Sequence, residues 1–326
     1  MKTFVIVNPA SAAGRTGRLW PGIEARLKAA IGEFEAKLTS APGQAVGLAS
    51  EAQREGFGRI IAVGGDGTAS EVLNGLFQDR EAEYDWAKGG MQIKPASDIQ
   101  MGIISSGTGG DFPRSTGLSG DLKGQIAAIA GGQIKRIDVG GINLTREDGI
   151  RHRHYFLNGA SLGLSAEIAA GVNRGGTGKK AGGRFAFLIS ALKVLFKQKP
   201  LRIMIAFDGS RPEMITTALI TVMNGRYAGG GFKLAPMAEL DSGFLEAIVV
   251  GDVGLGDLVL NARRLYRGRH LSHPAIKHQR FIDLEASAIA DARVGIEADG
   301  EVVGRLPARF DVFPRALDIF WPQEQE

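Results

Sequence analysis

At 326 residues the chain is long enough to form two compact domains, each with a sizeable core. Its hydrophobic fraction of 44% and charged fraction of 23% exclude a fibrous chain and one that is disordered over most of its length. The absence of cysteine excludes disulfide bonds, a thiolate metal site and a catalytic thiol. The net charge of +4 and the isoelectric point of about 9.3 favour anionic partners, such as a membrane surface or nucleotide phosphates.

The first part of the chain alternates short apolar runs with amphipathic segments. Its first run, residues 4–7, is too short for a signal peptide or a membrane-spanning helix, so we expect a cytoplasmic protein. The alternation predicts an α/β nucleotide-binding domain at residues 1–138, with a mostly parallel sheet flanked by helices. Strands are predicted at residues 4–7, 34–38, 60–63, 101–104 and 134–139, and helices at residues 22–31, 72–77 and 122–129.

Beyond about residue 139, strand-like runs follow one another with few helices between them. This pattern predicts an antiparallel β-sandwich domain at residues 139–313, with helical exceptions near residues 181–198 and 255–267. The apolar end of the chain, residues 314–322, can return to either domain. The predicted strands are residues 154–157, 201–207, 215–223, 245–250, 280–284, 294–297 and 309–313.

A glycine-rich sequence, residues 63–68 (Val-Gly-Gly-Asp-Gly-Thr), stands where the third predicted strand ends and a helix begins. Glycines let the backbone turn sharply and bring N–H groups close to an anion, and a helix N-terminus favours negative charge, so a phosphate would fit. A carboxylate beside phosphates needs a cation or a proton, and Asp66 therefore points to magnesium. The alternative is a tight turn without a ligand, in which Thr68 and Glu71 form a capping box.

Two more joints follow predicted strands. Residues 105–112 (Ser-Ser-Gly-Thr-Gly-Gly-Asp-Phe) come after the fourth strand, and residues 8–11 (Asn-Pro-Ala-Ser), with Gly14 and Gly17, come after the first. Because the carboxyl ends of parallel strands meet at one edge of a sheet, the three joints can line one crevice for a nucleotide. An ordinary loop and a plain strand–turn–helix connection are the respective alternatives.

In this order the joints resemble the motifs of the diacylglycerol kinase catalytic-domain family, which includes sphingosine and ceramide kinases. The Gly-Gly-Asp-Gly-Thr sequence alone is shared with NAD kinases and resembles a phosphofructokinase motif, but the combined order is far more specific. The resemblance covers nearly the whole chain and implies an NAD kinase- or phosphofructokinase-like first domain. Motifs similar to those of the family's second domain are residues 158–163 (Asn-Gly-Ala-Ser-Leu-Gly), 236–238 (Pro-Met-Ala), 241–243 (Asp-Ser-Gly) and 299–301 (Asp-Gly-Glu).

The activity implied by the resemblance is ATP-dependent phosphorylation of a membrane lipid alcohol, with ATP and Mg²⁺ as cofactors. Diacylglycerol, converted to phosphatidic acid, is the foremost substrate, and a sphingoid base or ceramide is the alternative. Such an enzyme would be cytoplasmic and peripherally associated with the anionic inner face of the membrane. A soluble kinase of the NAD kinase type and a catalytically inactive relative that binds lipid or nucleotide are the other hypotheses.

The resemblance also implies residue roles. Glu301 would be the general base that accepts the proton of the lipid hydroxyl, and Asp66 and Asp111 would complete the catalytic set. An exposed turn carboxylate is the alternative for Glu301, and a simple helix cap is the alternative for Asp111. Magnesium would be bound by Asp66, Asp241 and Ser242. The residues implied to contact ATP are Asn8, Thr39, Gly64, Gly65, Asp66, Gly67, Thr68, Gly107, Thr108 and Glu301.

Two residues depart from the family pattern. Gly110 stands where the family usually has Asn, which removes an amide side chain from the predicted crevice. Ser242 stands where the family often has a second Asp, and a hydroxyl is a poorer magnesium ligand than a carboxylate. These departures motivate the hypothesis of an inactive relative.

Two basic segments bear on partners. Residues 173–202 combine eight Lys and Arg side chains with a wide apolar set, which favours a helix in the membrane headgroup plane or one packed on the sandwich. The cluster between Arg263 and Arg280 has no stacking aromatic residue other than Tyr266, so a solvated face is predicted rather than a nucleic-acid site. A homodimer through a sheet edge or a helix face is a further hypothesis.

Overall fold

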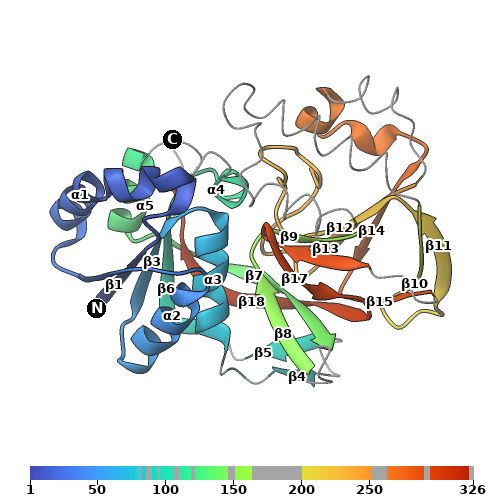
Figure 1. Cartoon of the computed structure of the whole chain (residues 1–326), viewed down its shortest axis with the longest axis horizontal. Coiled ribbons are helices and arrows are strands. Elements are labelled where there is room, and N and C mark those ends of the chain that lie inside the picture. The colour runs from blue at the N-terminus through green and yellow to red at the C-terminus, as the bar shows by residue number, and fades with distance from the viewer. Residues whose placement is uncertain are drawn as a thin grey trace.

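The computed structural model describes residues 1–78, 80, 82–85, 90–93, 96–105, 110–118, 122–145, 151–163, 200–251, 263–289 and 294–322. Figure 1 shows a half in which helices surround a sheet, and beside it a half built mainly of strands. The strand pairing is parallel in the first half and antiparallel in the second. The predicted fold class, an α/β domain followed by an antiparallel β-sandwich, is confirmed.

The first half is built on four parallel strands in the order β2-β1-β3-β6. Each overlaps a strand predicted from the sequence. Apolar runs mark β1, β3 and β6, whereas β2 alternates polar and apolar residues (Glu-Ala-Lys-Leu). The strands are β1 (Thr3–Val7), β2 (Glu35–Leu38), β3 (Arg59–Gly64) and β6 (Ala96–Ser105). The helices are α1 (Ser11–Ile31), α2 (Gln44–Arg54), α3 (Asp66–Phe77), α4 (Asp111–Ser115) and α5 (Leu122–Gly131).

Helices cover both faces of this sheet, as its apolar strands require. Successive side chains of a strand point to opposite faces. Phe4 and Ile6 of β1 belong to a core shared with α2 and α3, whereas Val5 and Val7 belong to a core shared with α1 and α5. All four side chains are buried, which is why β1 is a continuous apolar run and not an alternating one.

Helix α2 is not expected from the sequence. Its buried side chains include the small residues Ala45, Ala49 and Ala52, so the stripe of large apolar residues that usually indicates a helix is missing. The small side chains allow a close approach to α3. A β-carbon on Gly75 of α3 would overlap the Val46 carbonyl oxygen of α2, so this contact depends on glycine.

The second half is a sandwich of two sheets around a core that includes Phe156, Phe281 and Phe310. One sheet has six antiparallel strands in the order β14-β13-β12-β9-β16-β17. These are β9 (Gly159–Leu162), β12 (Leu219–Met223), β13 (Leu245–Val250), β14 (Ile276–Phe281), β16 (Gly295–Ala298) and β17 (Glu301–Arg305). The other contains β7 (Ile134–Thr145), β8 (Arg151–Phe156), β10 (Leu201–Phe207), β11 (Glu213–Thr217), β15 (Asp283–Ala288) and β18 (Ala308–Phe320).

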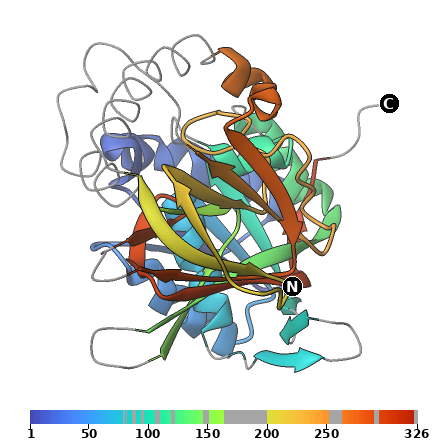
Figure 2. The ribbon, with the colours of Figure 1, turned by 90° about the vertical axis from the view of Figure 1, so that its right-hand side faces the viewer.

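Two strand predictions in this half are wrong in the same way. The apolar run at residues 215–223 is not one strand: it is divided at Ala218 between β11 and β12, which lie in different sheets. Residues 280–284 are likewise divided at Ile282 between β14 and β15. The chain passes from one layer of the sandwich to the other without leaving the core, so no polar turn marks either break. Figure 2 shows the layers from the side of the sandwich.

Strand β18 joins the two halves. It pairs antiparallel with β7 on both sides of a register shift between Phe313 and Leu317. Its other edge pairs antiparallel with β15 before the shift and parallel with β6 after it. Residues 317–320 therefore return to the first half, and the sheet that β18 completes has ten strands among the described residues. Strand β7 runs across residue 138, and the limits 1–138 and 139–313 stay a prediction.

The remaining described elements are small. A separate two-stranded sheet is formed by β4 (Ala82–Asp85) and β5 (Gly90–Ile93), and η2 (His270–Ser272) is a single 3-10 turn. The helix predicted at residues 181–198 lies outside the described residues, and the one at 255–267 is described only from residue 263, where it is helical. No helix in the described part of the chain is both long enough and apolar enough to cross a membrane.

Replacing Gly75 with alanine is expected to lower the free energy of unfolding by about 1–3 kcal/mol, because the new methyl group overlaps the backbone of α2. Urea denaturation measures this change. The matched control is Gly47→Ala in α2 itself, where a β-carbon would have no atom within 4 Å and alanine should stabilise the helix slightly. Equal effects at the two positions would show that the helix contact is not as close as described.

Candidate active site

The segments that follow β1, β2 and β3 meet at one edge of the parallel sheet. Val7, the last residue of β1, is paired with both Leu38 and Val63, so the residues after these strands start side by side. The backbone N–H of Asn8 donates to the Val63 carbonyl over 2.9 Å, and that of Thr39 donates to the Val7 carbonyl over 2.8 Å. Asn8 and Thr39, both predicted to contact ATP, therefore lie on the same edge. The predicted contacts Gly107 and Thr108 lie outside the described residues.

The glycine-rich joint after β3 is fixed by contacts between its own residues and Asn8. The amide nitrogen Nδ2 of Asn8 donates to Thr68 Oγ1 over 3.1 Å. A β-carbon on Gly64 would overlap that same hydroxyl, so only glycine fits there. Helix α3 then begins at Asp66, with Gly65 extended before it. The N-terminal N–H groups of α3 thus face the edge where the segments after β1, β2 and β3 meet.

The capping-box alternative for Thr68 and Glu71 is wrong. Thr68 is the third residue of α3 rather than the residue before it. The carboxylate of Glu71 accepts the backbone N–H of Ala45, over 3.0 Å, at the start of α2. Glu71 therefore caps the neighbouring helix, and the start of α3 has no side-chain cap of its own.

Asp66 and Asp111 lie together. The backbone N–H of Asp111 donates to Asp66 Oδ2 over 3.1 Å. Burial, and to a smaller extent the negative charge of Asp111, raises the pKa of Asp66 to about 6. Burial also raises the pKa of Asp111. A cation, or a proton shared by the two groups, would remove the electrostatic repulsion between these two buried carboxylates.

Asp111 is not a simple helix cap. It is the first residue of α4, and its Oδ2 accepts the backbone N–H of Gly230 over 2.7 Å, from a loop of the second half. Its Oδ1 lies 3.1 Å from Nη1 of Arg114. The backbone of the second half therefore helps to hold Asp111, a residue of the first half.

The Asp-Gly-Glu turn between β16 and β17 is fixed by Asp299. This residue has a positive φ of 47°, and its carboxylate accepts three backbone N–H groups. Leu157 donates to Oδ2 over 2.8 Å, while Asn158 and Gly159 donate to Oδ1 over 3.0 and 3.1 Å. Burial raises the pKa of Asp299 to about 7, and the nearby charge of Asp66 contributes. The anchoring role of Asp299 is not predicted from the sequence, because its partners are backbone groups that any residues would supply.

Glu301 lies against the glycine-rich joint. A β-carbon on Gly67 would lie 3.1 Å from Glu301 Oε1, so the carboxylate faces the first turn of α3. Burial raises the pKa of Glu301 to about 7, and the charge of Glu71 adds to the effect. An exposed turn carboxylate, the alternative for Glu301, is therefore wrong. The structure brings the predicted base from the second half to the predicted phosphate site of the first.

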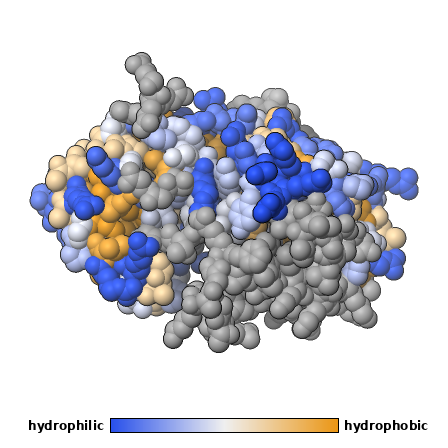
Figure 3. All heavy atoms as spheres, turned by 90° about the horizontal axis from the view of Figure 1, so that it is seen from above, coloured by the Kyte–Doolittle hydropathy of each residue, from blue (hydrophilic) through white to orange (hydrophobic). Residues whose placement is uncertain are grey.

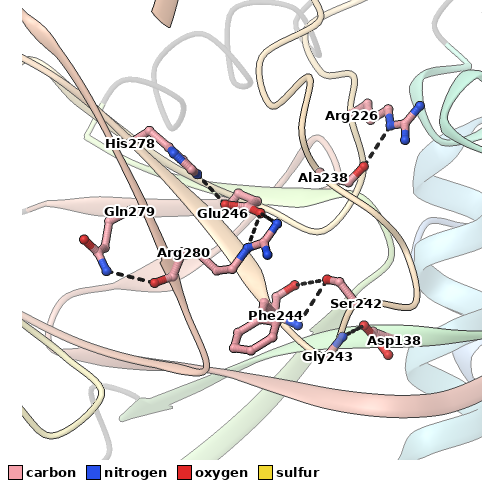
Figure 4. A network of polar contacts seen from close by, with 10 residues as sticks. All are labelled: Asp138, Arg226, Ala238, Ser242, Gly243, Phe244, Glu246, His278, Gln279 and Arg280. Carbon is pink, nitrogen blue, oxygen red and sulfur yellow. Dashed lines mark hydrogen bonds and ion pairs between the residues drawn. The ribbon is translucent and has the colours of Figure 1, made fainter.

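The predicted metal residues are in different surroundings. Asp66 contacts Asp111, whereas Asp241 Oδ1 lies 3.0 Å from Nζ of Lys135. The hydroxyl of Ser242 bonds to the backbone N–H and carbonyl of Phe244, each over 3.3 Å (Figure 4). Within the described ranges, no group of three or more His, Asp or Glu side chains is arranged to hold a metal ion. The metal roles of Asp66, Asp241 and Ser242 stay predictions.

Comparison with known families assigns both halves. The diacylglycerol kinase catalytic domain matches residues 2–142, and the YegS C-terminal NAD kinase beta sandwich-like domain matches residues 159–321. A protein named diacylglycerol kinase from Staphylococcus aureus (strain bovine RF122 / ET3-1) is 29% identical over 321 residues, which cover 98% of this chain and 92% of that protein. Its counterpart in strain MRSA252 has the same identity and coverage.

Solved structures share the fold. A crystal structure described as a diacylglycerol kinase from Bacillus anthracis str. Sterne aligns with a TM-score of 0.69 and 21% identity, covering 99% of this chain and 97% of that one. Another crystal structure from the same organism aligns with a TM-score of 0.72 and 23% identity over the same shares. The two-domain arrangement is therefore common to these proteins.

Asp299→Asn is expected to lower the free energy of unfolding by about 1–3 kcal/mol. Both oxygens of Asp299 accept backbone N–H groups, so an amide must turn its own NH₂ towards at least one donor. Urea denaturation measures the loss. Asp208→Asn is the matched control, because Asp208 has a similar φ of 50° but accepts both of its backbone N–H groups on Oδ1 alone, which an amide oxygen can still do. Equal losses in the two variants would contradict the anchoring role of Asp299.

Proposed function

We propose that this chain, which belongs to the diacylglycerol kinase catalytic-domain family, transfers the γ-phosphate of ATP to the hydroxyl of diacylglycerol and so forms phosphatidic acid. The observation that carries the proposal is the position of Glu301, whose carboxylate lies against Gly67 in the first turn of α3. The name of the Staphylococcus aureus relatives supports diacylglycerol as the acceptor. A sphingoid base or ceramide is the alternative acceptor within the same chemistry.

ATP would bind along the edge where the joints meet. The phosphates would lie at the N-terminus of α3, where free backbone N–H groups and the helix dipole favour an anion. Asn8 and Thr68 hold the glycine-rich joint in shape through their mutual hydrogen bond, and Thr39 would contact the nucleotide from the end of β2. The contacts proposed for Gly107 and Thr108 rest on their sequence motif.

Asp66 fits the requirements of a magnesium ligand. Its carboxylate is buried at the start of α3, beside the proposed phosphate site, and its pKa is raised by burial and by Asp111. Mg²⁺ prefers carboxylate and phosphate oxygens, so the ion would be held by Asp66 and the phosphates of ATP. When bound, it would neutralise the charge of the transferred phosphoryl group. Asp111 would act as a positioning residue, because its backbone N–H holds Asp66.

Glu301 would accept the proton of the lipid hydroxyl. A general base works best when its pKa lies near the working pH, and burial raises the pKa of Glu301 to about 7. The hydroxyl oxygen then attacks the γ-phosphorus in line with the leaving group. Phosphoryl transfer needs mainly positioning and charge neutralisation, so one well-placed carboxylate is enough.

Glu301→Gln is expected to lower kcat about 10²–10⁴-fold while ATP binding is kept, because the amide cannot accept the proton. The measurement is transfer of labelled γ-phosphate from ATP to diacylglycerol in mixed micelles, with sphingosine, ceramide and NAD tested in parallel. Glu285→Gln removes an exposed carboxylate of β15 and is the control. A rate close to that of the wild type would contradict the role of Glu301.

The substrate panel also tests the second candidate function, a soluble NAD kinase-like activity. The match of residues 159–321 to an NAD kinase-like sandwich favours this candidate. Label in NAD alone would replace the lipid proposal with this one. ATP binding without label in any acceptor would identify an inactive relative.

The rate should also depend on pH. If deprotonated Glu301 is the active form, kcat rises with pH through an apparent pKa near 7 and is about thirtyfold lower near pH 5.5 than near pH 8. The affinity for ATP, measured over the same range, is the control. A kcat that does not change over this range would show that proton transfer to Glu301 does not limit the reaction.

A further inference from the structure

One segment of the sandwich half carries an unusual concentration of positive charge. Residues 263–282 contain six Lys and Arg residues, three His and no Asp or Glu. The formal charge of this segment exceeds the net +4 of the whole chain. We call its six Lys and Arg side chains the basic face: Arg263, Arg264, Arg267, Arg269, Lys277 and Arg280.

The basic face is exposed at one end of the sandwich. Residues 263–267 are helical, and Lys277 and Arg280 follow on β14, the edge strand of the six-stranded sheet. All six side chains belong to exposed residues. The helical turn, orange in Figure 1, lies at the top of the molecule, and Figure 3, which looks down on this side, shows strongly hydrophilic surface over the same half.

Only part of this charge is neutralised nearby. Arg280 bonds to Glu246 through Nε, over 2.9 Å, and His278 bonds to the other oxygen of the same carboxylate (Figure 4). Glu246 is buried, so it fixes these two side chains from beneath. In the part of the chain that the structure covers, the other five members of the basic face form no ion pair with a carboxylate. The face therefore attracts an anionic surface.

Two half-exposed aromatic rings accompany the charges. Tyr266 and Phe244 are each 37% exposed. The ring of Tyr266 packs on that of Phe232 with centroids 4.7 Å apart, and the guanidinium of Arg280 lies 5.4 Å from the centre of the Phe244 ring. Aromatic rings among basic side chains are typical of surfaces that enter the headgroup region of a bilayer. A nucleic-acid site would offer a row of stacking rings, and these two are held by their own neighbours.

The basic face also adjoins the candidate active site. The backbone N–H of Lys233 donates to the Leu265 carbonyl over 3.1 Å, and the ring of His270 bonds to the Leu234 carbonyl over 3.0 Å. The same loop donates its Gly230 N–H to Asp111. One loop thus lies between the basic face and a carboxylate of the site. A surface bound at the basic face would therefore lie one loop away from the candidate active site.

We infer that the basic face docks this protein on an anionic lipid bilayer and turns the candidate active site towards it. The second part of the inference rests on the proposed lipid kinase function, whereas docking itself does not. Each Lys or Arg near an anionic surface strengthens binding about fivefold, so the five unpaired members are enough for reversible association. Residues 173–202, where membrane contact is predicted from the sequence, lie almost wholly outside the described residues.

The test compares the full chain with two variants in sedimentation with vesicles. Arg263→Glu/Arg267→Glu reverses two charges one helical turn apart on the basic face. Arg26→Glu/Arg54→Glu makes the same change in net charge at exposed positions of α1 and α2 and is the control. The vesicles are pure phosphatidylcholine, or phosphatidylcholine with about one third phosphatidylglycerol.

We expect the wild type to bind the anionic vesicles and not the neutral ones, and to be released as salt rises from about 0.05 M to about 0.5 M. The variant Arg263→Glu/Arg267→Glu should bind at least about tenfold more weakly, whereas the control should stay within about twofold of the wild type. Equal binding by the two variants would overturn the inference. So would tighter binding to a DNA duplex than to the vesicles, lost in the same variant.

Turnover separates this inference from the proposed function. Arg263→Glu/Arg267→Glu should phosphorylate lipid in uncharged micelles at the wild-type rate and lose activity on anionic vesicles. An equal loss in micelles would overturn the inference, because it would show damage to the site instead of lost docking. The wild type could also bind anionic vesicles through the basic face and yet phosphorylate no lipid. This result would contradict the proposed function and support docking.

Discussion

The continuity of β18 through both halves of the molecule is the constraint on which the candidate site depends. This strand pairs with β15 and β7 in the sandwich and with β6 in the α/β half, so one sheet fixes the relative position of the two. The shift of register within it is held by Asp138, whose carboxylate accepts the N–H groups of Arg315 and Gly243 over 2.7 and 2.6 Å. Because β17 precedes β18 directly, the position of Glu301 against Gly67 follows from this continuity.

The candidate site brings together several buried carboxylates, although their negative charges repel one another. Asp66, Asp111, Asp299 and Glu301 all have a pKa raised chiefly by burial. For Asp66, Asp299 and Glu301, the charge of a neighbouring carboxylate also raises the pKa. Burying like charges costs free energy, and backbone N–H groups offset part of that cost at Asp299 and Asp111. Such an arrangement is typical of a site that receives a cation, a proton or both. This is the electrostatic basis on which we propose a catalytic role for these carboxylates.

The sequence could predict the parts of this site that depend on local patterns. Short apolar runs ended by glycine-rich joints predicted the strand ends, and the joints at Asn8 and Gly64 do lie on one edge. The contacts made across the chain could not be predicted in the same way. Glu71 caps α2, a helix that is not expected from the sequence because its buried residues are small. Asp299 binds backbone N–H groups of residues distant in the sequence. A backbone donor leaves no mark in the sequence, so only the fold reveals these partners.

The two departures from the family pattern change side-chain chemistry more than geometry. Gly110 has a φ of 57°, a conformation that glycine and asparagine both adopt, so the backbone at this position suits either residue. A β-carbon there would be 3.5 Å from Ser105 Oγ, an ordinary contact, and what the chain lacks is therefore an amide and not space for one. Ser242 turns its hydroxyl to the backbone of Phe244. Neither change reaches Glu301 or Asp66, and the proposed chemistry depends on those two carboxylates.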